Sequence, residues 1–498
     1  MRTHFKGLVA LLAAAWLAVV TLAGQAQAKK DSLVLAMALE PPGLDPTAGA
    51  ASAIAEIVLY NVFETLTKIG SDGKVTPLLA ESWEISPDLK TVTFKLRKGV
   101  KFQNGEPFNA QTVKYSFERA AGDKSTNKDK RLFQSMAFVK PVDETTVVIG
   151  MKTIEPDLLF LLGQATAIMV EPKSVETNAT QPVGTGPFKL ENWAKGSSVT
   201  LVKWPGYRDA AAIRLSKVTF RFISDPAAQV AALLAGDVDV FPRVTAARSL
   251  EQIKADGRFQ VIVGGTRAKT ILAINNKKPP LNDVRVRRAI AAAIDRKAVI
   301  EGAGDGLGAP IGSHYVPGAL GYIDTTGINP FDIEKSKALL KEAGVKLPLE
   351  LSLKLPPPGY ARQGGEVIAA ELAKVGIVAK IENVEWAQWL SAVYKDRNYD
   401  LTIISHVEPF DLGNFAKPDY YWGYDNPAFN KLYEQINNAP TTTERARLLG
   451  EAQKMIANDA VAAYLYQPQF LTVANKHVKG IGKDMPIFDN DLSLMYWQ

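Results

Sequence analysis

Short stretches in which apolar and polar residues alternate predict β-strands along the chain. The clearest stretch covers residues 91–96, where Val92, Phe94 and Leu96 would face one side and the intervening polar residues the other. Residues 377–384 follow a similar pattern, with Ile377 and Ile381 on one face. Further strands are predicted over residues 32–37, 145–151, 238–241 and 399–404.

Longer stretches with apolar residues three and four positions apart predict helices. These stretches cover residues 52–67, 109–120, 226–235, 283–295, 332–343, 366–375 and 442–458. Asn109, Asn282 and Asp332 favour helix starts, because their side chains can accept hydrogen bonds from free backbone N–H groups. Gly236 and Gly344 favour helix ends. Strands and helices alternate, which indicates an α/β fold, and 498 residues are enough for two or three lobes.

The first 28 residues have the features of a cleavable signal peptide. Arg2 and Lys6 precede an apolar run over residues 8–22, and Ala26-Gln27-Ala28 matches the small-x-small pattern before a cleavage site. The alternative is a membrane anchor, but this run is shorter than the roughly 20 residues needed to span a bilayer. The chain has no cysteine to carry a lipid. We therefore predict a free periplasmic protein of a Gram-negative bacterium.

Composition argues against several classes of function. The formal net charge is +6, and loss of Arg2 and Lys6 with the signal peptide would leave +4, too little to indicate a nucleic-acid-binding face. Without cysteine there are no disulfides, thiolate metal sites or cysteine nucleophiles. No serine has the Gly-x-Ser-x-Gly surroundings of a hydrolase nucleophile, and the glycine-rich stretch 302–308 trails a helix instead of opening one, unlike a phosphate loop.

Five segments, spaced over nearly the whole chain, carry a family resemblance. The most specific is 78–117, in which a Trp-led strand, a Pro-Asp turn, a strand ending in Leu-Arg and the sequence Gly-Val-Lys-Phe precede a helix. The others are VGTGPF at 183–188, ALLAGDVDV at 232–240, LNDVRVRRAIAAAID at 281–295 and YDNP at 424–427. In these segments the chain resembles the bacterial extracellular solute-binding proteins of family 5, the peptide/nickel-type (cluster C) substrate-binding proteins of ABC transporters.

This resemblance implies a type II periplasmic-binding-protein-like α/β fold, with two lobes, hinge crossings and an extra α/β domain. Lobe I would contain residues 29–75, 180–266 and 476–498, the extra domain 76–179, and lobe II 267–475. Crossings near Gly264-Gly265 and Ala474-Asn475 would act as hinges. The protein would be a monomer without cofactor or enzymatic activity, binding a peptide-like polar solute in the interlobe cleft and delivering it to ABC permease subunits of the inner membrane.

The resemblance also places an acidic ligand-binding residue in the loop after the predicted strand 399–404. In peptide-binding members, this acid holds the amino group of the ligand. The loop here contains Glu408 and Asp411, and either carboxylate could pair with an ammonium group. His406 lies near the place where nickel-type members carry a histidine, so a nickel chelate is an alternative ligand. The histidines show no short metal-ligand spacing, and we predict no protein-bound metal.

Five more residues complete the predicted site. In peptide-binding members, an arginine ahead of the helix predicted over 366–375 binds the ligand carboxylate. Arg362 is the candidate for this role here; alternatively, the Arg362 side chain faces solvent. Trp386 and Tyr421 could stack on a ligand, or belong to the core. Gly43 and Leu44 lie in a turn that would bring backbone groups to the cleft mouth. The arginine that family members usually carry earlier in this stretch is absent here, which leaves opines, modified amino acids and oligosaccharides as alternative ligands.

Two alternatives belong to other classes of function. They are a secreted hydrolase with paired carboxylates and a chaperone for unfolded segments.

Overall fold

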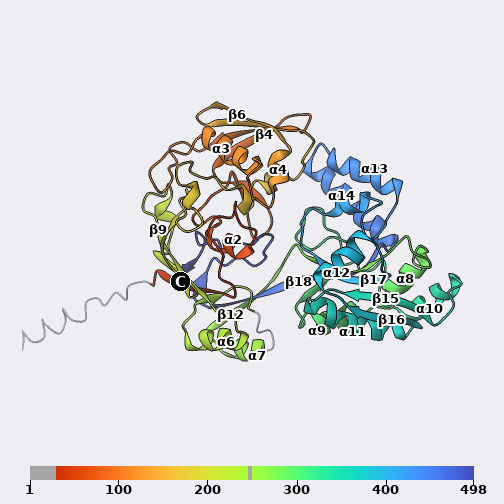
Figure 1. Cartoon of the computed structure of the whole chain (residues 1–498). Coiled ribbons are helices and arrows are strands. Elements are labelled where there is room, and N and C mark those ends of the chain that lie inside the picture. Colours follow the sequence, from red (N-terminus) through yellow and green to blue (C-terminus); the bar gives the residue numbers. More distant parts are fainter. Residues whose placement is uncertain (1–29, 245–248) are drawn as a thin grey trace, which may run out of the picture.

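The structure consists of two large bodies joined by extended strands (Figure 1). It is a computed structural model that describes residues 30–244 and 249–498. The predicted signal peptide lies outside the described residues. In Figure 1, lobe I surrounds the labels α2, β9 and α6, the extra domain carries the labels β4, β6 and α3, and lobe II carries β15, β16 and β17.

One mixed sheet runs through both lobes. Its strand order is β16-β15-β17-β13-β18-β11-β1-β10-β9-β8, and β12 and β14 also pair with β18. The lobe I strands are β1 (Ser32–Met37), β8 (Phe188–Ala194), β9 (Ser198–Lys203), β10 (Lys217–Phe222), β11 (Val240–Phe241) and β12 (Phe259–Gly265). The lobe II strands are β13 (Lys269–Ile274), β14 (Gly308–Pro310), β15 (Leu349–Leu355), β16 (Ile377–Asn383) and β17 (Leu401–His406).

The long strand β18 (Ala462–Asn475) belongs to both lobes. Its first half pairs with β13 as far as Tyr466, and its second half pairs with β12 from Gln469 to Asn475. The strand therefore passes from lobe II to lobe I between these two ladders. The crossing predicted at Ala474-Asn475 is wrong, because both residues pair with strands of lobe I. The other crossing lies between the end of β12 and the start of β13.

Lobe I packs α2 (Ser52–Val58), α6 (Pro226–Ala235) and α7 (Leu250–Ala255) against its part of the sheet. The glycines of the 183–188 segment permit a close backbone approach. A Cβ atom on Gly184 would lie 1.9 Å from the carbonyl oxygen of Val62, and one on Gly186 would lie 2.4 Å from that of Asn61. The hairpin of β2 (Thr67–Ile69) with β3 (Val75–Pro77) and the antiparallel pair of β19 (Val478–Lys479) with β20 (Tyr496–Trp497) complete the lobe.

The extra domain is a four-stranded antiparallel sheet with helices on one side. The order is β4 (Ala80–Ile85), β5 (Thr91–Leu96), β7 (Thr146–Met151) and β6 (Met136–Asp143). The alternation in β5 places Val92, Phe94 and Leu96 in the core, beside Phe117 of α3 (Ala110–Ala121). The Asn109 side chain caps α3, as predicted. Two short helices, α4 (Lys130–Gln134) and α5 (Leu158–Leu161), follow.

Lobe II covers its sheet with helices on both faces, and the two faces form separate apolar cores. The helices are α8 (Val284–Ala292), α9 (Arg296–Ala303), α10 (Ile333–Glu342), α11 (Gly359–Ala373), α13 (Pro427–Asn437) and α14 (Thr442–Asn458). The short α12 (Trp386–Trp389) continues into η5 (Leu390–Lys395). The glycine-rich stretch 302–308 connects α9 to β14. None of the helices in the described part of the chain has the length and apolarity to cross a bilayer.

Three sequence predictions need correction at helix ends. The helix predicted over 52–67 ends at Val58, because Tyr60 adopts a left-handed conformation (φ 61°) and the chain turns into β2. The helix predicted over 366–375 begins earlier, at Gly359. Asp283, not Asn282, caps α8 by accepting from the backbone N–H of Arg285.

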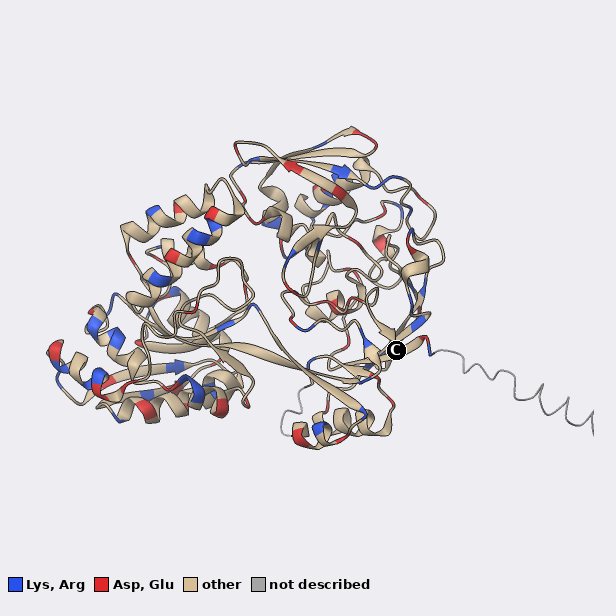
Figure 2. Ribbon diagram, turned by 180° about the vertical axis from the view of Figure 1, so that it is seen from behind, with Lys and Arg blue, Asp and Glu red and all other residues tan. Residues whose placement is uncertain are grey.

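The arginine-rich face of α8 holds lobe II together. Arg285 forms an ion pair of 2.6 Å with Asp283. The buried Arg287 donates to the backbone carbonyls of Asp459 and Ala460, at the end of α14. These contacts give the arginines of α8 a structural role, and Arg287 is enclosed by protein. Figure 2 shows acidic and basic residues interspersed along the lobe II helices.

Candidate functional site

The acidic loop, residues 407–411, leaves β17 at His406 and enters the short helix η6 (Leu412–Ala416). The neighbouring strand β13 fixes where this loop starts, because Lys269 pairs in register with His406. The Lys269 ammonium group donates to the backbone carbonyl of Glu408 and also reaches Asp411. The first residue of β13 therefore holds both acidic positions of the loop in place.

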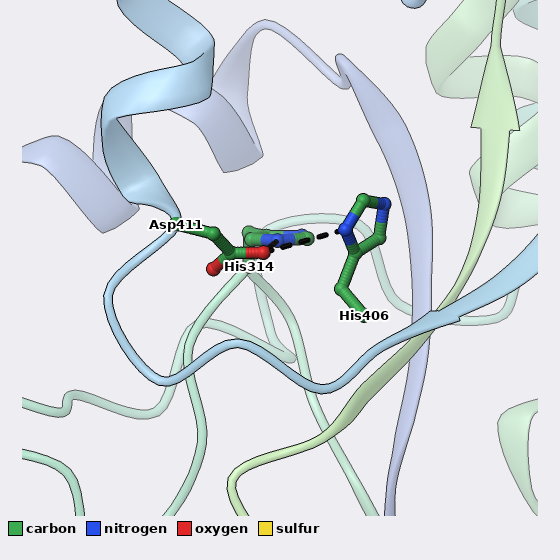
Figure 3. Close-up of side chains that lie close together, drawn as sticks. All are labelled: His314, His406 and Asp411. Atoms are coloured by element: carbon green, nitrogen blue, oxygen red, sulfur yellow. Dashed lines mark hydrogen bonds and ion pairs between the residues drawn. The ribbon is translucent and has the colours of Figure 1, made fainter. Parts of the chain in front are cut away.

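Asp411 lies at the centre of a buried polar cluster (Figure 3). Its Oδ1 is 2.7 Å from Lys269 Nζ, and its Oδ2 is 2.7 Å from His314 Nε2. The Nδ1 of His406 lies 3.4 Å from Oδ2. The side chains of Lys269 and Asp411 are 3% and 5% exposed, and that of His314 is fully buried. Such enclosure makes the charge balance of this cluster decisive for stability.

Lys269 and Asp411 neutralise each other inside the cluster. Burial opposes the charge of Asp411, but the neighbouring His314 and Lys269 outweigh it and hold the pKa of the Asp411 carboxyl well below its usual range. Burial lowers the pKa of His314 to about 4, so its imidazole is neutral at pH 7 and donates from Nε2 to Asp411. The net result is one buried cation, one buried anion and a neutral histidine.

Glu408 has the opposite environment. Its side chain is 65% exposed, and its closest basic group among the described residues is His406 Nδ1, at 3.9 Å. Its backbone is fixed by Lys269, while its carboxylate is largely exposed at the edge of the buried cluster, beside His406. Of the two predicted acids, Glu408 therefore offers an available carboxylate, whereas Asp411 already has its partners.

Aromatic side chains surround the loop. The Tyr421 ring is buried and nearly parallel to the His406 ring, with 7° between the planes, and its hydroxyl is 2.9 Å from His406 Nε2. Trp389 packs against Tyr421, and Trp386 packs against Trp389. Trp386 also begins an exposed apolar stripe at helical spacing, which consists of Trp386, Leu390 and Tyr394. Tyr421 therefore supports the loop, and the stripe provides an apolar surface beside it.

The structure places the other predicted residues farther apart. Arg362, on α11, forms an ion pair of 3.1 Å with Glu385, the residue that precedes α12. Gly43 and Leu44 lie in lobe I, where the Leu44 N–H donates to the Ala179 carbonyl and the Leu44 side chain is fully buried. Among the predicted residues, only His406, Glu408, Asp411 and Tyr421 share direct contacts.

The acidic loop faces the extra domain. The Phe410 ring meets Phe160 of α5 edge to face, with ring centroids 4.9 Å apart. Nearby, Arg445 of α14 forms two bonds of 2.8 Å with the carboxylate of Asp157. These two pairs join lobe II to the extra domain. The loop therefore lies between lobe II and the extra domain.

A hinge cavity of about 210 Å³ lies where the strands cross between the lobes. The cavity lining from lobe I consists of Ser71, Asp72, Lys483, Asp484 and Pro486, and the crossing contributes Val263 and 265–267. Lobe II contributes Ala309, Pro317, Gly318 and two residues of β18. The segment 314–318 connects this cavity with the acidic loop, because His314 at its start binds Asp411 and Gly318 at its end lines the cavity.

Sequence reasoning missed Lys269 and His314. The sequence pattern that could have indicated Lys269 is a lysine at the start of an apolar run (KTILAI). A charged residue on a buried strand needs a partner of opposite charge. Potential ligand atoms of His314, His406 and Asp411 lie within 4.8 Å of one another, as a metal site requires. The Lys269 ammonium on the same carboxylate would repel a divalent cation, so we interpret the cluster as a hydrogen-bonded support.

Comparison with known proteins decides the family. The family model "Bacterial extracellular solute-binding proteins, family 5 Middle" matches residues 74–411. The chain belongs to this family. It is 28% identical to the dipeptide-binding protein of Escherichia coli (strain K12), over 93% of this chain and 94% of that protein. The family prediction from the sequence is thus confirmed.

Solved structures confirm the fold. HbpA2 from Haemophilus parasuis aligns with a TM-score of 0.87 at 23% identity, over 94% of this chain and 100% of that chain. The murein tripeptide-binding protein MppA of Escherichia coli, in its unliganded open form, aligns with a TM-score of 0.85 at 23% identity, over 94% and 98% of the two chains. The predicted type II periplasmic-binding-protein fold is therefore correct. The family and these relatives are binding proteins.

Proposed function

We propose that this protein is the substrate-binding component of an ABC importer for peptides or peptide-like solutes. Family membership supports the transport role, and the relative with 28% identity is named for dipeptides. The observation that carries the ligand class is the exposed carboxylate of Glu408, on a loop fixed by Lys269 between the two bodies. A carboxylate in this position suits the ammonium group of a peptide.

The same arrangement supplies the other parts of a binding site. The exposed stripe of Trp386, Leu390 and Tyr394 offers apolar surface for ligand side chains. The lobes are connected through β18 and the 265–269 crossing, which leaves rotation about these strands as the available closing motion. Closure would enclose Glu408 and its ligand, remove water and strengthen the ion pair.

The remaining parts of the proposal concern location and partners. The segment 1–28 would direct export to the periplasm and be removed there. The mature monomer would release its solute to permease subunits of the inner membrane and act without catalysis. We also propose the lobe division given by the sequence, with the second crossing moved to the point where β18 changes partners.

Isothermal titration calorimetry on the mature chain tests this function. The ligand panel contains di-, tri- and tetrapeptides, opines, oligosaccharides and nickel chelates. Saturable peptide binding with one site per chain supports the proposal. Binding of an opine, sugar or chelate in place of peptides would keep the transport role and overturn the substrate class. Native mass spectrometry of the protein from its periplasm provides an independent identification of the solute.

A further inference from the structure

Arg267 lies in the crossing between β12 and β13, and its side chain enters the hinge cavity. The guanidinium group lies over the turn at Gly73 in lobe I, where an added Cβ would be only 2.1 Å from Nη2. Arg267 is only partly exposed, and burial lowers the pKa of its guanidinium. A cation from the crossing therefore lies against lobe I, at the base of the space between the lobes.

No other described residue forms an ion pair or a side-chain hydrogen bond with this guanidinium. Other enclosed arginines have protein acceptors: Arg208 forms two bonds with Glu64, Arg445 two with Asp157, and Arg296 donates to three backbone carbonyls. Leaving such a group without an anion costs free energy, because water is partly excluded while no protein acceptor replaces it. An unpaired arginine in a cavity is thus available for an anion from outside the chain.

The other charged groups of the cavity do not fill this role. Asp484 affects Arg267 through space, but its Oδ1 accepts from the Gly265 N–H at 2.8 Å. Asp72 forms an ion pair of 2.8 Å with Lys74. Lys483 adds a second basic group to the cavity lining. An entering anion would therefore meet a region whose carboxylates are engaged and whose arginine is not.

We propose that Arg267 binds the carboxylate of the ligand in the hinge cavity, so that the site recognises short zwitterionic molecules. This inference rests on the proposed function. Glu408 is bound through its carbonyl to Lys269, and Arg267 precedes Lys269 by two residues, roughly 7 Å of extended chain. The segment 314–318 continues the wall from the Asp411 cluster to the cavity. Opposite charges anchored at this spacing fit the two ends of a short peptide.

Arg267 also explains how the chain can recognise a carboxylate without the arginine expected ahead of α11. Arg362 is already paired with Glu385. The guanidinium fork suits a carboxylate because two parallel N–H···O bonds can form at once. The ligand class is thus narrower than peptide-like solutes: it requires both an ammonium and a carboxylate group.

Calorimetry with di-, tri- and tetra-alanine, and with the C-terminal amide of each, tests this assignment. For the wild-type protein we expect the amides to bind at least about tenfold more weakly than the free acids. Arg267→Gln should weaken binding of the acids by about tenfold or more and bring acid and amide affinities within about twofold of each other. Arg221→Gln changes an exposed arginine of lobe I that pairs with Asp237, and should leave both affinities unchanged.

The outcomes separate the two proposals. If alanine peptides bind but Arg267→Gln leaves the preference for the acid intact, the assignment of Arg267 is wrong and the peptide function stands. An equal loss for acid and amide would also overturn it, because that result indicates a structural role. If no alanine peptide binds the wild-type protein, neither the proposed peptide-binding function nor the assignment of Arg267 holds for peptide ligands. Thermal unfolding without ligand checks folding, and Arg267→Lys provides a second variant that keeps the charge and loses the fork.

Discussion

Replacement of Lys269 by methionine tests the buried charge pair under the acidic loop. Methionine keeps an unbranched side chain of similar length but removes the ammonium group that lies 2.7 Å from Asp411. The Asp411 carboxylate would then remain buried without its cationic partner, beside the neutral imidazole of His314. Breaking a buried ion pair by removing one partner costs about 3–5 kcal/mol. For a lobe of roughly 200 residues, this cost corresponds to a decrease of about 6–20 °C in melting temperature.

Differential scanning calorimetry at pH 7 measures the effect. The double variant Lys269→Met/Asp411→Asn should recover a large part of the lost stability, because it no longer buries an unpaired charge. Lys337→Met is the matched control, since this lysine forms an exposed pair with Glu334 on α10. We expect the control to lose less than about 1 kcal/mol.

The dependence on pH provides a second check. Without Lys269, burial should raise the pKa of Asp411 above its unfolded value. The folded variant then binds more protons than the unfolded chain, so its stability deficit should shrink as the pH falls from 7 to 5. A decrease of less than about 2 °C for Lys269→Met, or a double variant no better than the single one, would refute the reasoning about this pair.

Three further outcomes follow from the site. Glu408→Ala should weaken binding of an amine-bearing peptide by more than about tenfold without changing the melting temperature of the free protein, and calorimetry showing equal affinity would remove Glu408 from the site. The wild-type protein should lose about 3 kcal/mol of stability as the pH falls from about 6.5 to 4, because the lowered pKa of His314 makes protonation favour the unfolded chain. His314→Gln should abolish this loss, and parallel curves of stability against pH for the two proteins would contradict the reasoning. Small-angle scattering should show a smaller radius of gyration with saturating peptide, and an unchanged radius would argue against closure.

Much of the fold could be predicted because its signals are local. The alternation over 91–96 gives β5 with its observed bounds, and the 3.6-residue pattern with Asp332 as cap gives α10. The helix prediction over 52–67 was wrong at its C-terminal end because the local pattern there is ambiguous. Its apolar residues continue past Val58, but they enter the lobe I core from a turn and not from a helix. Hydrophobic periodicity alone could not distinguish these two ways of burying the same side chains.

The candidate site was less accessible to sequence reasoning. The loop and both acids could be located, but the choice between them depends on Lys269 and His314, which lie 142 and 97 residues away from Asp411. Contacts over such separations leave no periodic pattern in one sequence. Arg267 escaped notice for a related reason: its position at the crossing depends on strand pairing, and its missing partner is visible only once its neighbours are known.

The sharing of β18 between the two lobes has a consequence for biosynthesis. β1 and β10 of lobe I leave the ribosome early, but β11 and β12 gain their β18 partner only after residue 475 has been made. The lobe I sheet therefore cannot be completed while most of the chain is being translated. Its long-range pairings favour slow folding. In the export that we propose, such a delay would help to keep the nascent polypeptide unfolded until it has crossed the membrane.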